Sequence, residues 1–187
     1  MTASTHQGLI IQGGAALNFP PPASGYARRA YGDVTPDFGP SPWLVVRPDG
    51  SILVLAGKVE YGQGIRTGLA IEVADELRVP LERVEVVLGD TARVPWDMGT
   101  FGSQSTARVG LQLRKAAATA RQVMLELAAD RLDLPVDALS ARDGRVASVS
   151  DAARSLGYGE LLGAEIVVRE VDDHDAPRIP EDVQPAP

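Results

Sequence analysis

Two short loops carry most of the residues that could bind a ligand, and both are rich in glycine, hydroxyl and amide side chains. The first loop covers residues 60–64 (EYGQG), and the second covers residues 99–106 (GTFGSQST). An amphipathic pattern follows each loop, so each is predicted to lead into the N-terminus of a helix. A helix start leaves backbone N–H groups without partners and carries partial positive charge. Since glycine lets a ligand approach the backbone, the two loops together predict a cradle for an anionic, polar ligand.

Gln63 is the most distinctive side chain of the first loop, because it lies between Gly62 and Gly64. Its amide can donate and accept hydrogen bonds at once, which suits the edge of a heterocycle. An ordinary glycine turn is the alternative interpretation. The loop is no dinucleotide fingerprint, because the third glycine falls at Gly68, one place late. It is no phosphate-binding P-loop either, because no Gly-Lys-Ser/Thr follows.

The second loop offers four hydroxyls, an amide and several backbone N–H groups close to a predicted helix start. This set suits phosphate groups or the polar atoms of a pterin. The alternative is a plain capped helix start, in which Ser105 or Thr106 is the capping residue. The candidate ligand-binding residues of this loop are Phe101, Gly102, Ser103, Gln104, Ser105 and Thr106.

Composition excludes several other kinds of site. The 187 residues contain no cysteine, so the chain has no thiolate and no iron–sulfur cluster of its own. Its two histidines, His6 and His174, lie in predicted terminal segments. The carboxylates of Glu60, Asp90 and Asp97 are not spaced as a catalytic pair and are interpreted as solvated or capping groups. We therefore predict no catalytic and no metal-binding residue in this chain.

The charge and hydropathy pattern limits the partners. The net charge of −7 argues against nucleic acid or an anionic membrane as the main partner. The sequence contains no run of about 18 apolar residues, so no membrane-spanning helix is predicted. Residues 1–19 lack the basic and apolar regions of a signal peptide. A cytoplasmic location without membrane insertion is the expectation.

The order of apolar patterns predicts an α+β fold, with a mixed β-sheet and two main helices packed on one face. An extended Pro/Gly-rich arm (1–42) is expected before a folded domain (43–171) and an acidic, Pro-rich tail (172–187). The arm is interpreted as a segment that orders on a partner, and a disordered tail is the alternative. The predicted strands are 43–49, 51–59, 83–88 and 165–171, with a hairpin over 140–149; the predicted helices are 65–77, 105–133 and 158–162.

The two loops, the helix between them and their spacing resemble a known family. The runs GKVEYGQGIRTGLAIEVADEL, VPLERVEVVLGDT and GTFGSQST, followed by a long alanine-rich helix, are similar to the molybdopterin-binding subunit of the xanthine dehydrogenase and aldehyde oxidase family. The β subunit of the isoquinoline 1-oxidoreductase type is the most similar branch. The resemblance covers roughly residues 43–163, which is most of the predicted folded domain.

This resemblance implies a molybdopterin cofactor, in bacteria often molybdopterin cytosine dinucleotide. It implies hydroxylation of an N-heterocycle or oxidation of an aldehyde, with water as the oxygen source. Gln63 would then bind the pterin or the dinucleotide, and Ser103, Ser105 and Thr106 would contact polar groups of the cofactor. Phe101 and Gly102 match positions beside the metal pocket. The implied partners are a small subunit with two [2Fe–2S] clusters and, in some complexes, an FAD or cytochrome subunit.

The GGFG-like loop that contacts the other half of the pterin is missing from these 187 residues. Residues 157–160 read GYGE, the letters of the family's GxGE-type motif, but the catalytic glutamate is not assigned to them. The resemblance therefore implies a split subunit, inactive alone, whose larger partner supplies both. A truncated chain is the other interpretation. A purely structural or assembly module that binds no cofactor is the competing functional hypothesis.

Overall fold

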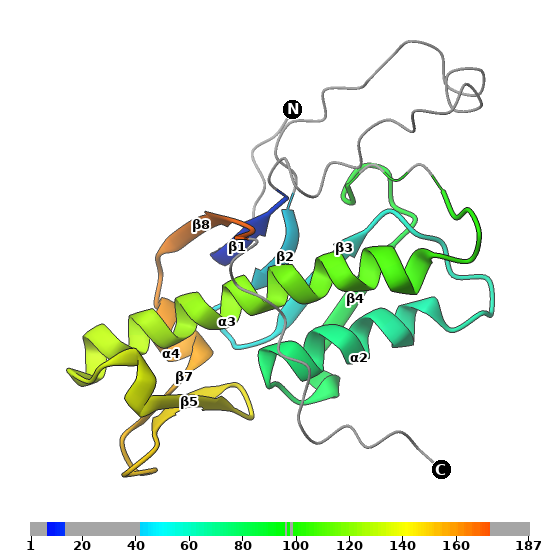
Figure 1. Ribbon diagram of the computed structural model, residues 1–187. Helices are drawn as coiled ribbons and strands as arrows, with labels where there is room; N and C mark the ends of the chain where they lie inside the picture. The colour runs from blue at the N-terminus through cyan, green and yellow to red at the C-terminus, as the bar shows by residue number, and fades with distance from the viewer. Residues whose placement is uncertain (1–6, 14–41, 96, 98, 173–187) are drawn as a thin grey trace, which may run out of the picture.

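The computed structural model describes residues 7–13, 42–95, 97 and 99–172, and it consists of two sheets and a layer of helices (Figure 1). The main sheet has the strand order β4-β3-β2-β1-β8, and a small sheet has the order β5-β6-β7. The strands of the main sheet are β1 (Gly8–Gln12), β2 (Pro42–Val46), β3 (Ile52–Ala56), β4 (Val84–Leu88) and β8 (Ile166–Glu170). Those of the small sheet are β5 (Leu139–Arg142), β6 (Arg145–Ser148) and β7 (Ser155–Gly157).

The helices are α2 (Ile65–Leu77), α3 (Leu111–Leu132) and the short α4 (Tyr158–Leu162). A π-helical segment, η2 (Ser105–Gly110), precedes α3, and the short 3-10 turns are η1 (Leu81–Arg83) and η3 (Val136–Ala138). Figure 1 shows α2 and α3 side by side on one face of the main sheet. The two helices contact each other, α2 contacts β4, and α3 contacts β1 and β2.

The main core lies between this helix layer and the sheet, and alternation along the strands builds it. In β3, Ile52, Val54 and Ala56 face the helices, whereas Leu53 and Leu55 belong to a second buried cluster on the other face. The interior strand β3 is therefore apolar on both faces, which explains its unbroken apolar run. The four alanines 116, 117, 118 and 120 of α3 are buried, so this helix packs closely.

The small sheet is fixed to the C-terminal end of α2 by hydrogen bonds. The Tyr158 hydroxyl donates to the Leu77 carbonyl at 2.7 Å, and the Gly144 N–H donates to the Arg78 carbonyl at 2.8 Å. The last carbonyls of a helix have no partner inside the helix, so these donors satisfy groups that would otherwise be buried without one. Burial raises the pKa of Tyr158, which keeps its hydroxyl a donor.

The predicted α+β class, the mixed sheet and the two helices on one face are confirmed. The hairpins at Asp49-Gly50 and Asp143-Gly144 are present. The left-handed φ of Asp143 (51°) and Gly144 (72°) is the conformation that a two-residue hairpin turn requires.

Two elements differ from the prediction. Residues 8–12, which we expected to belong to an extended arm, form β1 between β2 and β8. The run GLIIQ is too short for periodicity to separate a strand from a tail, and long-range pairing decides. The strand β7 was not predicted, because three residues are too few to show a hydrophobic period. The rest of the expected arm and nearly all of the expected tail lie outside the described residues.

Removing the Tyr158 hydroxyl tests how the small sheet is attached. We expect Tyr158→Phe to lower the free energy of unfolding by about 1–3 kcal/mol, because the Leu77 carbonyl stays buried without its donor. Tyr61→Phe is the matched control, since Tyr61 is 84% exposed. Urea denaturation measures both, and equal midpoints for the two variants would contradict this role.

Candidate cofactor-binding site

Both candidate loops lie at the same end of the helix layer. The helices α2 and α3 begin at this end, which is at the right in Figure 1, and η2 contacts α2. Gly110, the last residue of η2, lies so close to Glu72 of α2 that an added Cβ would be 2.9 Å from the carboxylate. The loops 60–64 and 99–106 therefore lead into two helix starts at the same end of the helix layer. We call this end of the molecule the loop end.

A buried ion pair holds the second loop in place. The Lys58 ammonium lies 2.6 Å from the Asp97 carboxylate, and their side chains are only 7% and 6% exposed. Lys58 also donates to the Gly99 carbonyl at 2.9 Å, and Asp97 accepts the Gly99 N–H at 2.7 Å. Since Lys58 lies two residues beyond β3, the pair ties the start of the second loop to the central sheet.

Gly57 allows this close approach. An added Cβ would lie 2.5 Å from the Asp97 Cβ and 2.6 Å from the Pro95 carbonyl, which is too close for any larger residue. The interpretation of Asp97 as a solvated or capping group was wrong. No local sequence signal marked the pair, because 39 residues separate its partners.

The start of α2 already holds an anion, the carboxylate of Glu60. One Glu60 oxygen accepts the N–H groups of Gly62 (2.7 Å) and Gly64 (3.0 Å), and the other accepts the Arg66 N–H at 3.0 Å. These backbone bonds, that of Arg66 first, lower the pKa of Glu60 below its ordinary value of 4.5. The prediction that an anionic ligand binds at both helix starts is therefore wrong for the start of α2, and for the start of η2 it stays a prediction.

The Gln63 amide shapes the first loop and still has hydrogen-bonding capacity. Its Oε1 accepts the Tyr61 N–H and its Nε2 donates to the Val59 carbonyl, both at 2.8 Å. An amide has two donors and two acceptor positions, so one of each is left over. Gln63 is exposed, and nothing lies within 4 Å of an added Cβ on Gly62 or Gly64. The space beside this backbone is open to a ligand.

Among the described residues, no side chain caps the second helix start, η2. The alternative interpretation made Ser105 or Thr106 the cap, but the Ser105 hydroxyl instead contacts the Thr100 hydroxyl at 2.6 Å. Gly102 and Ser103 both adopt left-handed φ (62° and 57°), which turns the chain sharply before η2. Since Gly102, Ser103, Gln104 and Thr106 are exposed, their polar groups are accessible. These groups fit a phosphate or a pterin edge, and the π-helical geometry is a form often found at functional sites.

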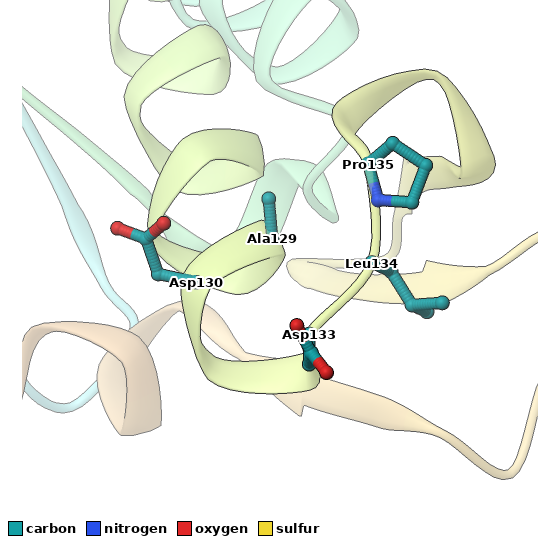
Figure 2. A pocket seen from close by; sticks show the side chains of 5 residues that line it. All are labelled: Ala129, Asp130, Asp133, Leu134 and Pro135. Carbon is teal, nitrogen blue, oxygen red and sulfur yellow. The ribbon is translucent and has the colours of Figure 1, made fainter.

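The described residues offer little for any other kind of site. No group of three or more histidine, aspartate or glutamate side chains among them could hold a metal ion, and none of their helices is long and apolar enough to cross a membrane. A depression lies at the turn after α3, lined by Ala129, Asp130, Asp133, Leu134 and Pro135 (Figure 2). It lies about 33 Å along α3 from the loop end. Its two carboxylates and lack of a basic group make it unsuitable for an anionic cofactor.

Taken with the fold, the loop end has the features of a cofactor-binding class of domain: a helix start that no described side chain caps, exposed hydroxyls and an amide with remaining hydrogen-bonding capacity. The chain matches the model of the molybdopterin cofactor-binding domain over residues 25–177. That match covers most of the chain, and the chain belongs to this family, within the molybdopterin-binding subunits of the xanthine dehydrogenase and aldehyde oxidase family. The resemblance inferred from the sequence is confirmed.

Curated relatives include chains of two bacterial oxidoreductases. The β subunit of isoquinoline 1-oxidoreductase from Brevundimonas diminuta is 33% identical over 182 residues, which is 91% of this chain and 23% of that protein. A nicotinate dehydrogenase chain from Pseudomonas putida is 40% identical over 120 residues, which is 64% of this chain and 10% of that protein. The chain therefore spans a quarter or less of these relatives.

Solved structures give the same result. Quinoline 2-oxidoreductase from Pseudomonas putida 86 superposes with a TM-score of 0.57 at 27% identity, over 65% of this chain and 15% of that one. A reconstituted CO dehydrogenase from Oligotropha carboxidovorans gives a TM-score of 0.58 at 27% identity, over 63% of this chain and 15% of that one. Both show that the fold described here forms one part of a much larger chain.

Breaking the buried ion pair tests whether it holds the second loop. We expect Lys58→Met to lower the free energy of unfolding by about 3–5 kcal/mol, because the Asp97 carboxylate stays buried without its partner. Arg142→Met removes the cation from the exposed Arg142–Asp143 pair and should have an effect close to zero. Urea denaturation measures the two variants, and an equally small loss for both would show that the loop does not depend on Lys58.

The Glu60 carboxylate predicts a pH dependence of the first loop. Since its pKa is lower in the folded state, it stabilises the loop above pH 4.5, and this stabilisation is lost as the pH falls through the folded pKa. Hydrogen exchange of the Gly62, Gly64 and Arg66 amides, corrected for the intrinsic rate, should therefore lose protection below that pH. Glu60→Ala should remove the protection at every pH, and pH-independent protection in the unmodified chain would contradict the assignment.

Proposed function

We propose that this chain forms one wall of the molybdopterin dinucleotide site in a molybdenum hydroxylase. The exposed, uncapped start of η2 is the observation that carries the proposal, because it is the helix start at the loop end that no described side chain occupies. The family membership supports it, since the same domain type binds molybdopterin. When bound, the cofactor supplies the redox chemistry, and this chain supplies position and electrostatic stabilisation.

Each candidate residue has a distinct task in this proposal. The backbone N–H groups that begin η2, with the hydroxyls of Ser103 and Thr106, bind the negatively charged part of the cofactor. The remaining donor and acceptor of the Gln63 amide bind a polar edge of its heterocycle. Gly62, Gly64 and Gly102 keep the backbone accessible. Gln104 and Ser105 add polar groups at the same turn, and Phe101, 50% exposed, packs beside the metal-binding part of the cofactor.

The remaining parts of the site come from elsewhere in the complex. The chain spans 23% or less of the two curated relatives compared above, and we assign none of its residues as the general base. A larger partner region therefore supplies the catalytic glutamate and the other pterin loop. We propose the cytosine dinucleotide form of the cofactor, an iron–sulfur subunit as electron acceptor and a cytoplasmic complex. An aldehyde or N-heterocycle is the proposed substrate class.

The test compares cofactor content in the purified native complex. Gln63→Ala and the double variant Ser103→Ala/Thr106→Val should each lower the molybdenum and bound nucleotide per complex, by about ten-fold for the loss of 1.4 kcal/mol of binding. Ser140→Ala, an exposed hydroxyl in β5, is the control. Far-UV circular dichroism of the variant chains should be unchanged. Normal molybdenum and nucleotide content in both variants would favour the scaffold hypothesis, in which the domain binds no cofactor.

A further inference from the structure

The two edges of the main sheet differ in how their backbone groups are satisfied. At the β4 edge, the Arg66 guanidinium donates to the Val86 carbonyl, and α2 packs against the strand. The opposite edge is β8, which pairs with β1 in parallel register. The Val171 N–H, just beyond β8, donates to the Gln12 carbonyl. This bond fixes which residues of β8 face the sheet and which face outward.

Backbone groups alternate in direction along a strand, so β8 has an inner and an outer set. The Val171 N–H points towards β1. Since the direction repeats at every second residue, the N–H and C=O groups of Val167 and Arg169 also point towards β1. Those of Ile166, Val168 and Glu170 point away from the sheet. Among the described residues, the one hydrogen bond observed for this outer set runs from the Arg169 side chain to the Val168 carbonyl. The edge is open for pairing with a further strand.

The side chains of the outer set also lack cover. Val168 stands opposite Ile10, which is followed across the sheet by Val45 and Leu53. Those three are 7%, 0% and 0% exposed, but Val168 is 45% exposed and Ile166 is 59% exposed. The apolar row on this face of the sheet therefore ends abruptly at β8. A neighbouring strand with apolar residues on the same face would continue it.

We propose that β8 pairs with an extended strand from the part of the molybdenum-binding subunit that this chain does not span. A five-residue edge buries far less than the roughly 1,000 Å² of a stable independent interface. The occupant must therefore be held at other contacts as well, which excludes a second copy docked by this edge alone. Relatives several times longer than this chain supply such a segment. Main-chain hydrogen bonds would give the affinity. Apolar residues at alternate positions, on the sheet face that carries Ile166 and Val168, would give the specificity.

Hydrogen exchange with single-residue fragmentation tests the pairing directly. In the isolated full chain, the amides of Ile166, Val168 and Glu170 should exchange fast, whereas those of Val167 and Arg169 are protected. In the purified native complex, the outer amides should slow by about a hundred-fold. Fast exchange of the outer amides in the complex would overturn the proposal, and so would slow exchange in the isolated chain that rises with its concentration, which would show pairing of two copies.

A proline variant separates backbone pairing from side-chain contact. Val168→Pro removes an outward N–H and leaves the β1 ladder intact, so it should fold and yet reduce co-purified partner by about ten-fold. Val168→Thr keeps the N–H and should retain partner. Equal partner recovery in both variants would contradict a strand pair. The proposed cofactor site is judged separately, because a complex with normal molybdenum content and unprotected β8 amides would refute the strand pairing alone.

Discussion

The buried pair of Lys58 and Asp97 is the constraint on which the loop end depends. Two opposite charges at 2.6 Å, each less than a tenth exposed, are stable only with further hydrogen bonds. Here the N–H and C=O of Gly99 supply them. The pair fixes the chain at the point where it leaves β3 and where it enters the second loop. A rigid sheet thereby positions residues that a long loop alone would leave variable.

The two helix starts at this end have different roles, although their sequences look alike. Glu60 occupies the start of α2, and its carboxylate acts as a built-in anion that orders residues 60–66. The start of η2 has no such group and is surrounded by exposed hydroxyls. The first loop is therefore preorganised and offers one amide, whereas the second offers a helix start that no described side chain caps. The dinucleotide cofactor proposed above carries heterocycles and phosphates, and the two kinds of contact suit these two kinds of group.

Local patterns predicted most of the fold. The i+4 stripe from Ile65 to Leu77, the Asp-Gly turns and the alanine-rich helix each carry a period or a φ requirement that sequence displays. The position of β1 between β2 and β8 could not be predicted in this way, because it depends on pairing with residues about 35 and 158 positions later. The candidate site shows the same division. Glycine, hydroxyl and amide content near two helix starts indicated the candidate residues, and these remain a prediction.

Local sequence content did not show which helix start is occupied by a carboxylate. A glutamate two to six residues before its N–H partners looks in sequence like any solvated carboxylate. The Lys58–Asp97 pair was also hidden, since nothing local marks two charges 39 residues apart as partners.

The central claim is that η2, and not α2, receives the charged part of the cofactor. Hydrogen exchange of the purified complex, prepared with and without molybdenum cofactor, tests it most directly. The account predicts that cofactor slows the amides of residues 103–107, while the Gly62, Gly64 and Arg66 amides are protected equally in both preparations. Slowing confined to the start of α2, with no change at residues 103–107, would contradict it.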